Sequence, residues 1–300
     1  MKWPSKIMFA LFVAVAIGVT VLFGYRATAI SPAYQDVAYA DVSDRNELDI
    51  YLPSNSAEPK PLVVLVHGGG FRFGDKARPS NLQVFLDADF AVAAINYRLS
   101  GDAIWPAQRT DVSNAIKYLH DNAGSYGLDP LKIGVFGQSA GAHLAVSAAI
   151  DLFGNEHTYI KGVVDWFGPI DFTTMDADLA ASGNGTSNTN DAGSFESRLI
   201  GAPVGENPDL ARKASPLYAI KQLPDNVRLP PFLIMHGSKD PLIAARQSER
   251  LRDALEASPA NGGVSLQILP GGTHGGGDFK KPAAIEVVID FFDRTLKSTD

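Results

Sequence analysis

The chain of 300 residues is long enough for one large globular domain, and its content of 45% hydrophobic and 20% charged residues is typical of a globular protein. The formal net charge of −7 gives no electrostatic reason to expect a nucleic-acid partner or an anionic membrane surface. The absence of cysteine excludes disulfides, thiolate metal sites and cysteine nucleophiles, so any chemistry must come from oxygen and nitrogen groups.

The N-terminal 29 residues have the features of an export segment. Lys2 and Lys6 precede an uninterrupted apolar stretch over residues 7–23, and Ala27-Thr28-Ala29 has the small-x-small pattern of a cleavage site. Both a cleaved signal peptide and an uncleaved membrane anchor fit, because the stretch is near the lower limit for spanning a bilayer. Either alternative predicts an exported domain, periplasmic or extracellular, since the lysines stay on the cytoplasmic side. A buried core helix is the third alternative.

From residue 36 onward, strand patterns alternate with helix patterns. Segments 37–42 and 47–53 are expected to form an antiparallel pair that starts a sheet. Near-continuous apolar runs, typical of buried parallel strands, follow at 61–68, 90–97, 132–137, 159–168, 230–237 and 264–271. Helices are expected at 107–122, 139–150, 242–257 and 282–296. The last of these carries one apolar stripe, formed by Ile285, Val288, Phe292 and Leu296.

This alternation predicts an α/β fold with a mostly parallel sheet covered by helices on both faces. We expect residues 30–300 to form a single domain. One segment breaks the rhythm: residues 173–190 are rich in Gly, Ser, Asn and Asp and are too polar for a core element. We expect an excursion over the surface here, and a flap over residues 173–195.

The pentapeptide Gly137-Gln138-Ser139-Ala140-Gly141 lies between a predicted strand and a predicted helix. This is the context of the G-x-S-x-G nucleophile elbow, in which a sharp turn exposes the serine hydroxyl. Side chains at the two glycine positions would clash in such a turn. The following helix would point its positive N-terminal end at an anion formed beside Ser139. The alternative is a small residue in a plain turn.

A second glycine-rich run, His67-Gly68-Gly69-Gly70-Phe71, follows an earlier predicted strand. Backbone N–H groups held at such a loop stabilise the oxyanion that forms when an ester or amide is hydrolysed. We assign the N–H groups of Gly69, Gly70 and Ala140 as candidate oxyanion donors. A structural glycine turn is the alternative.

A serine nucleophile needs a base, and the base needs an orienting carboxylate. His274 follows the last predicted strand in a glycine-rich loop that can bring its imidazole over the sheet. Asp240 lies directly after a strand, at the edge of the sheet where ligands bind in such folds, although it would also cap the next helix. The chain order Ser139, Asp240, His274 is that of an α/β hydrolase. Other candidates for these two roles are His143, His236, Asp165 and Asp225.

Residues from about 36 to 297 resemble the bacterial α/β-hydrolase esterases of the hormone-sensitive-lipase-like and feruloyl-esterase-like groups. Gln138 and Ala142 depart from the GDSAGG elbow that is usual in the lipase-like group, which favours the feruloyl- or acetyl-xylan-esterase side. The sequence ahead of the HGGG strand also shows no counterpart of the long N-terminal cap helices of the lipase-like group. The resemblance rests on LDIYLP, HGGGF, NYRLS, GQSAGAH, HGSKDPLI and GGTHGG, in that order.

The resemblance implies an α/β-hydrolase fold and a carboxylic ester hydrolase that needs no cofactor and no metal. Ser139 would attack the ester, His274 would move the proton, and Asp240 would hold the imidazole. The expected substrate is a short-chain, acetyl or aryl ester, either a small molecule or linked to a polysaccharide. We expect no nucleic-acid partner, and a membrane contact only through the N-terminal segment. The oligomeric state stays open.

Five residues near the ends of predicted strands are candidates for lining an acyl or aryl pocket, although aromatic residues at such places are more often part of the core: Phe71, Trp105, Trp166, Phe167 and Leu242. Two other functions stay open. One is a serine peptidase or amidase of the same fold. The other is a non-catalytic binding protein on a hydrolase scaffold, which would have no need of a complete triad and oxyanion loop.

Overall fold

An eight-stranded sheet organises the computed structural model, which describes residues 30–54 and 58–298. The strands are β1 (Tyr34–Ala38), β2 (Glu47–Tyr51), β3 (Lys60–Val66), β4 (Ala91–Ile95), β5 (Leu128–Gln138), β6 (Ile160–Trp166), β7 (Phe232–Gly237) and β8 (Val264–Leu269). Their order in the sheet is β1-β2-β4-β3-β5-β6-β7-β8. Only the β1–β2 and β2–β4 pairs are antiparallel, so the prediction of a mostly parallel sheet is confirmed.

Two apolar layers cover the sheet, one on each face. In β3 the side chains of Leu62, Val64 and Val66 belong to one buried cluster, whereas Val63 and Leu65 belong to the other. This follows from the pleat of a strand, which points successive side chains to opposite faces. Since both layers are buried, the central strands read as continuous apolar runs rather than as an alternating pattern.

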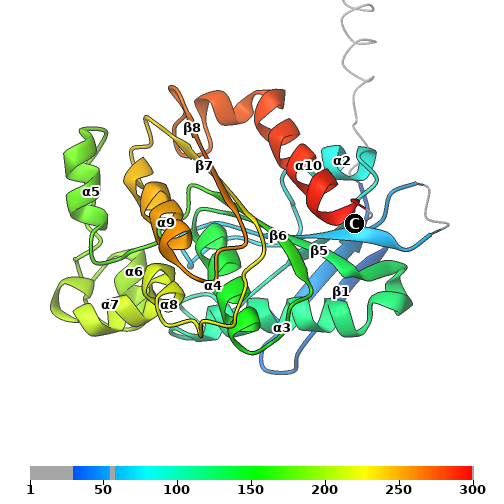
Figure 1. The fold of residues 1–300 in the computed structure, drawn as a ribbon. Helices are drawn as coiled ribbons and strands as arrows, with labels where there is room; N and C mark the ends of the chain where they lie inside the picture. The colour runs from blue at the N-terminus through cyan, green and yellow to red at the C-terminus, as the bar shows by residue number, and fades with distance from the viewer. Residues whose placement is uncertain (1–29, 55–57, 299–300) are drawn as a thin grey trace, which may run out of the picture. The chain divides into compact units, whose positions relative to one another are not determined.

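Helices on both faces of the sheet contribute side chains to the two layers, five of them in direct sequence alternation with the strands (Figure 1). The first layer contains side chains of α3 (Ala107–Asp121), α4 (Ala140–Gly154) and α9 (Ala245–Ala257), and the second contains side chains of α2 (Leu82–Asp87) and α10 (Pro282–Leu296). The predicted stripe of α10 is confirmed, because its four residues are all buried. The sequence pattern predicted four of these helices; α2 was not expected.

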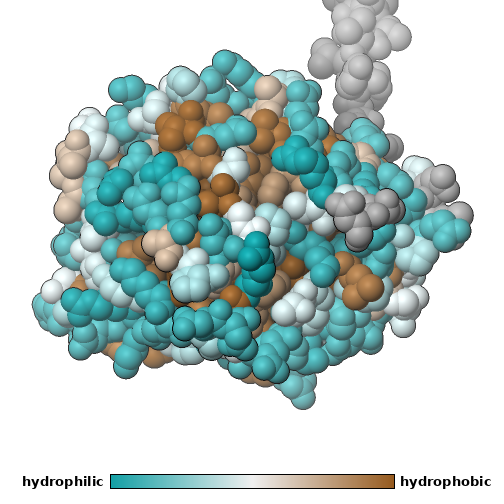
Figure 2. All heavy atoms as spheres, viewed as in Figure 1, coloured by the Kyte–Doolittle hydropathy of each residue, from teal (hydrophilic) through white to brown (hydrophobic). Residues whose placement is uncertain are grey.

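Strand β8 forms one edge of the sheet and pairs only with β7. Its side chains are mostly half-buried. Figure 2 shows a largely hydrophilic face of the molecule, with hydrophobic residues gathered where β8 lies between α9 and α10. The glycine-rich loop that follows β8 therefore starts from a partly exposed edge strand.

The segment expected to be a polar surface excursion contains a helix, α5 (Met175–Ser182). Met175 and Leu179 of this helix are buried, so the expectation that no core element lies here is wrong. The helix is tied to α9 by Asp178, whose carboxylate accepts hydrogen bonds from Arg250 and Gln247. The sequence pattern hides this helix because it is short and buries only two apolar side chains beside its polar contacts. Its movement as a flap stays a prediction.

Three more short helices, also not predicted, connect β6 to β7: α6 (Phe195–Ile200), α7 (Pro208–Ala214) and α8 (Pro216–Ile220). Single 3₁₀ turns lie at Ala123–Tyr126, Val204–Glu206 and Gly277–Lys280. Within the described ranges, no helix combines the length and the apolar composition needed to cross a membrane. The predicted export segment, residues 1–29, lies outside those ranges.

Candidate active site

Ser139 occupies a sharp turn between β5 and α4, with φ of 55° and ψ of −124°. Residues other than glycine rarely adopt a positive φ, and strained backbone of this kind clusters at functional sites. A Cβ atom at Gly137 would lie 2.2 Å from the carbonyl oxygen of Gly141, and one at Gly141 would lie 2.1 Å from that of Val66. The prediction that side chains would clash at both glycines is confirmed.

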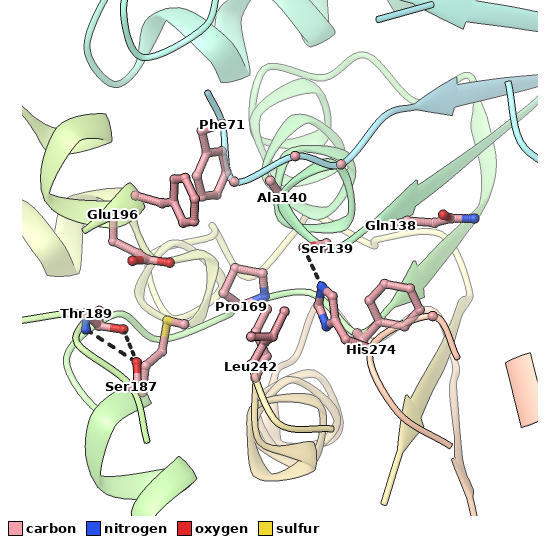
Figure 3. Close-up of a pocket in the computed structure, with 18 of the residues that line it drawn as sticks. Phe71, Gln138, Ser139, Ala140, Pro169, Ser187, Thr189, Glu196, Leu242 and His274 are labelled. Carbon is pink, nitrogen blue, oxygen red and sulfur yellow. Dashed lines mark hydrogen bonds between the residues drawn. The ribbon is translucent and has the colours of Figure 1, made fainter. Parts of the chain in front are cut away.

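The loop after β8 brings His274 between Ser139 and Asp240. Its Nε2 atom lies 2.9 Å from Ser139 Oγ, and its Nδ1 atom lies 2.8 Å from Asp240 Oδ2 (Figure 3 shows the first contact). With the proton on Nδ1 donated to Asp240, the Nε2 lone pair faces the serine hydroxyl. The three side chains thus form one hydrogen-bonded relay.

Asp240 is completely buried at the end of β7. Its Oδ1 atom accepts hydrogen bonds from the backbone N–H groups of Leu242 at 2.8 Å and Ile243 at 3.0 Å. Burial acts to raise the pKa of Asp240, but hydrogen bonding from His236 and His274 outweighs it and holds this pKa well below its ordinary value. Asp240 therefore stays ionised wherever an imidazole can work as a base.

The alternative bases His236 and His143 are both fully buried. His236 Nδ1 lies 2.7 Å from Ser248 Oγ, and its Nε2 lies 2.9 Å from the Ile243 carbonyl oxygen and 3.4 Å from Asp240 Oδ2. His143 Nδ1 lies 2.9 Å from the Pro169 carbonyl oxygen. Burial lowers the pKa of His143 to about 4, against the opposing effect of that carbonyl. Neither imidazole is hydrogen-bonded to the Ser139 hydroxyl.

The alternative carboxylates lie away from His274. Asp165, at the end of β6, is fully buried, and its Oδ1 accepts a hydrogen bond from the Gly168 N–H at 2.9 Å. Asp225 is exposed in the connection between α8 and β7. Of the three candidate carboxylates, only Asp240 contacts the imidazole of His274.

The glycine loop after β3 borders the Ser139 hydroxyl. Gly69, Gly70 and Ala140 all line the same pocket as Ser139. Ala140 is the first residue of α4, so its N–H has no partner inside the helix, and the helix dipole adds positive potential at this end. The three residues thus lie in the same pocket as the Ser139 hydroxyl, and their role as oxyanion donors stays a prediction.

His67, which precedes these glycines, supports the loop. Its Nδ1 lies 2.8 Å from the Gly68 carbonyl oxygen, and its ring stacks on Tyr97 at 4.4 Å between centroids. The Tyr97 hydroxyl donates to the His67 carbonyl oxygen at 2.9 Å. Burial lowers the pKa of His67 to about 4, although the Gly68 carbonyl acts to raise it. A neutral His67 thus holds the loop in place.

A pocket of about 560 Å³ opens onto Ser139 and His274. Of the five predicted lining residues, Phe71, Phe167 and Leu242 do line it. Leu242 is exposed at its rim, whereas Phe71 and Phe167 are nearly fully buried in its walls. Phe167 also packs against the imidazole of His274, with ring centroids 4.6 Å apart.

The structure places Trp105 and Trp166 elsewhere. The Trp105 ring lies edge-on to His143 at 5.5 Å and takes the Arg109 guanidinium over its face. Trp166 turns toward the layer that contains α10, where its ring packs 4.9 Å from Phe279. Neither tryptophan lines the pocket beside Ser139, so the prediction that these two residues line an acyl or aryl pocket is wrong.

Sequence reasoning missed one wall of this pocket. It comes from the connection between α5 and α6 and from the start of α6, and it includes Ser187, Thr189 and Glu196 (Figure 3). No motif marks these residues, and the polar composition of the segment was the only available signal. As for metals, the residues that the structure describes hold no group of three His, Asp or Glu side chains placed to bind an ion.

A family model described as BD-FAE matches residues 48–255. The chain belongs to the BD-FAE family. This match covers β2 through α9 and includes Ser139 and Asp240, whereas His274 lies beyond it.

Relatives of this BD-FAE chain are named as esterases. Isoprenylcysteine alpha-carbonyl methylesterase ICME of Arabidopsis thaliana is 32% identical over 253 residues, 80% of this chain and 56% of the relative. Esterase LipQ of Mycobacterium tuberculosis is 28% identical over 254 residues, 80% of this chain and 56% of the relative. The chain spans about half the length of the curated relatives it matches.

Solved structures agree with the BD-FAE assignment. A truncated carbohydrate esterase from gut microbiota has a TM-score of 0.76 and 30% identity, covering 91% of this chain and 99% of that one. The carboxylesterase EstE1 from a metagenomic library has a TM-score of 0.68 and 25% identity, covering 84% and 85%. The α/β-hydrolase fold and the resemblance to feruloyl-esterase-like and hormone-sensitive-lipase-like enzymes are confirmed. These relatives and solved structures are themselves named as methylesterase, esterase, carbohydrate esterase and carboxylesterase.

Proposed function

We propose that this protein is a serine carboxylesterase that works through an acyl-enzyme, with Ser139 as nucleophile, His274 as general base and acid, and Asp240 as the orienting carboxylate. The observation that carries the proposal is the hydrogen-bonded relay of these three side chains at the mouth of the 560 Å³ pocket. Family membership and the names of the relatives support the reaction class.

In the first half of the reaction, Ser139 Oγ attacks the ester carbonyl while its proton moves to His274 Nε2. The bond from Oγ to the carbonyl carbon forms, and the carbonyl oxygen becomes an oxyanion. The N–H groups of Gly69, Gly70 and Ala140 are the proposed donors to that oxyanion, each worth roughly 3 kcal/mol in the transition state. The intermediate then expels the alkoxide, which leaves as an alcohol with the proton from Nε2.

In the second half, water takes the place of the alcohol. His274 removes a proton from the water, whose oxygen attacks the acyl carbon, and the proton then returns to Ser139 as the carboxylic acid leaves. Asp240 keeps the imidazole in the tautomer that these steps need, and it stabilises the positive charge that forms on the ring. Its low pKa supports this role, because Asp240 stays ionised throughout the cycle.

The pocket favours a short acyl or an aryl ester. Phe71 and Phe167 form apolar walls beside the reacting centre, and Leu242 narrows the rim. A cavity of about 560 Å³ lies in the range of sites that bind small molecules. A carbohydrate esterase among the structural neighbours is compatible with a sugar-linked ester as the natural substrate.

The experiment that tests this proposal is fluorophosphonate labelling of the purified protein, with the adduct mapped by mass spectrometry. We expect one adduct, on Ser139, and none in Ser139→Ala. A series of p-nitrophenyl esters of increasing acyl length should then show fastest turnover for acetyl or butyryl esters. Peptide p-nitroanilides turned over faster than esters would indicate a peptidase or amidase instead. A folded protein that takes no label and hydrolyses neither class would support the binding-protein alternative.

A further inference from the structure

A carboxylate lies buried in the wall of the pocket on the side away from Ser139. Glu196, the second residue of α6, lines the pocket, yet only 9% of its surface is exposed. In Figure 3 its carboxylate extends into the pocket, on the same side as Ser187 and Thr189 and opposite the Ser139–His274 pair. Pro169 and Leu242 lie between these two sides.

The position of Glu196 is set by hydrogen bonds around it. Ser194 caps α6, accepting from the Ser197 N–H at 2.9 Å and donating to the Thr189 carbonyl oxygen at 2.8 Å. The N–H of Thr189 in turn donates to Asp176 of α5 at 2.8 Å. The start of α6 is therefore fixed against the loop that precedes it, and Glu196 is presented to the pocket by a braced element.

Among the residues that the structure describes, no cationic side chain is found to act on the Glu196 carboxylate. The groups that act on it are its own backbone N–H and the negative charge of Asp176. Burial is the main cause that raises the pKa of Glu196 to about 7, with Asp176 adding to the rise and the backbone N–H opposing it. A carboxyl group buried without a charged partner costs folding free energy, so it is typical of sites where a ligand supplies that partner.

We propose that Glu196 is a specificity-determining residue that recognises a hydrogen-bond donor on the substrate, a hydroxyl or an ammonium group, at a point remote from the ester carbonyl. This inference rests on the proposed function. The Ser187 hydroxyl lies 2.8 Å from the Thr189 hydroxyl on the same wall, which adds groups that can both donate and accept. An alkyl chain placed here would leave the carboxylate desolvated and without a charged partner, and the site would discriminate against such a chain.

The test compares p-nitrophenyl esters with acyl chains of four to eight carbons, each made with a terminal methyl, hydroxyl or ammonium group. The readout is the ratio of kcat/KM between the donor-bearing ester and its methyl counterpart at each length. At the best length we expect the wild-type ratio to favour the donor by about tenfold or more, since the site is built to pair with it. Glu196→Leu should abolish this preference for both donors.

The variant Glu196→Gln distinguishes recognition of a hydroxyl group from recognition of an ammonium group. Its amide oxygen still accepts from a hydroxyl, so part of the hydroxyl preference should remain, whereas the ammonium preference should disappear with the charge. The matched control is Glu206→Gln, the same change at an exposed glutamate outside the pocket, which should leave both ratios at wild-type values. If Glu196→Leu fails to fold, the test rests on Glu196→Gln, whose kcat/KM ratio of the ammonium ester to the methyl ester should fall to about one.

Ratios that are equal in wild type and in the Glu196 variants at every chain length would overturn the inference. The proposed function is checked separately in the same experiment, through fluorophosphonate labelling of Ser139 and turnover of the methyl-terminated esters. Labelling and turnover with unchanged ratios refute only the role of Glu196. The loss of both labelling and turnover in the wild-type protein refutes both proposals.

Discussion

The buried carboxyl of Asp165 is expected to make the protein less stable as the pH rises. Burial raises the pKa of Asp165 from 3.8 to about 6, against smaller opposing effects of the Gly168 N–H and of His236. Its Oδ1 atom accepts from that N–H at 2.9 Å, while its Oδ2 atom has no hydrogen-bond partner among the residues described. The ionised carboxylate therefore costs folding free energy that the protonated acid does not.

The size of this effect follows from the two pKa values. One pKa unit corresponds to about 1.4 kcal/mol, so ionised Asp165 lowers the free energy of unfolding by about 3 kcal/mol. Because the folded-state pKa lies above the unfolded one, the cost is absent below pH 3.8, grows between pH 3.8 and about 6, and is complete above that. Asp165→Asn removes the titration. Its free energy of unfolding should rise relative to wild type by about 2–3 kcal/mol between pH 4 and pH 8.

The assay is urea unfolding followed by tryptophan fluorescence, with wild type and variant measured at each pH. Asp225→Asn is the matched control, because it removes one carboxyl from an exposed loop and should give a difference close to zero. A difference between wild type and Asp165→Asn that stays constant from pH 4 to pH 8 would refute the reasoning. In that case, water or structural relaxation must satisfy the carboxylate at no cost.

Three other predictions concern the candidate site and the N-terminal segment. His274→Ala should lose almost as much ester turnover as Ser139→Ala, and the double variant little more, because residues that act as a unit are not additive; independent, additive losses in kcat would contradict the relay. Gly141→Ala should abolish labelling of Ser139, since its Cβ would lie 2.1 Å from the Val66 carbonyl oxygen, and wild-type labelling would show that the turn can relax. Deletion of residues 1–29 should leave a folded, active esterase, since Pro32–Asp300 forms one compact unit; a deletion variant that cannot fold would argue against an export segment.

Much of the sheet and the nucleophile turn could be predicted because their determinants are local. A strand buried on both faces needs a continuous apolar run, and the six runs between residues 61 and 271 that were predicted as strands are strands with bounds near those expected. The first strand was placed a few residues too late, since its side chains are mostly exposed and carry little pattern. The requirement for glycine at the elbow could also be predicted. A side chain at Gly137 would clash with Gly141, four residues on, and one at Gly141 would clash with Val66 of the adjacent strand.

The region between β6 and β7 could not be predicted in the same way. Its helices, α5 to α8, are short, and α5 combines two buried apolar side chains with polar contacts from α9. Glu196 gave no signal at all, because a glutamate at the start of a helix is ordinarily exposed and favourable there. Its significance comes from burial in a pocket wall, which depends on where the segment folds over the sheet.

The three candidate catalytic residues show where local sequence stops being sufficient. Their types, their positions after strands and their order along the chain were enough to select Ser139, Asp240 and His274 from many polar residues. The distances between their side chains could not be predicted, because His274 lies 34 residues from Asp240 and 135 from Ser139 along the chain. Only the parallel sheet, which brings the carboxyl ends of its strands to one edge, places these side chains within hydrogen-bond reach. The same tertiary arrangement keeps Trp105 and Trp166 out of the pocket and places Glu196 in its wall. The burial of a side chain and the cavity that it lines depend on how the helices pack on the sheet, which no local pattern encodes.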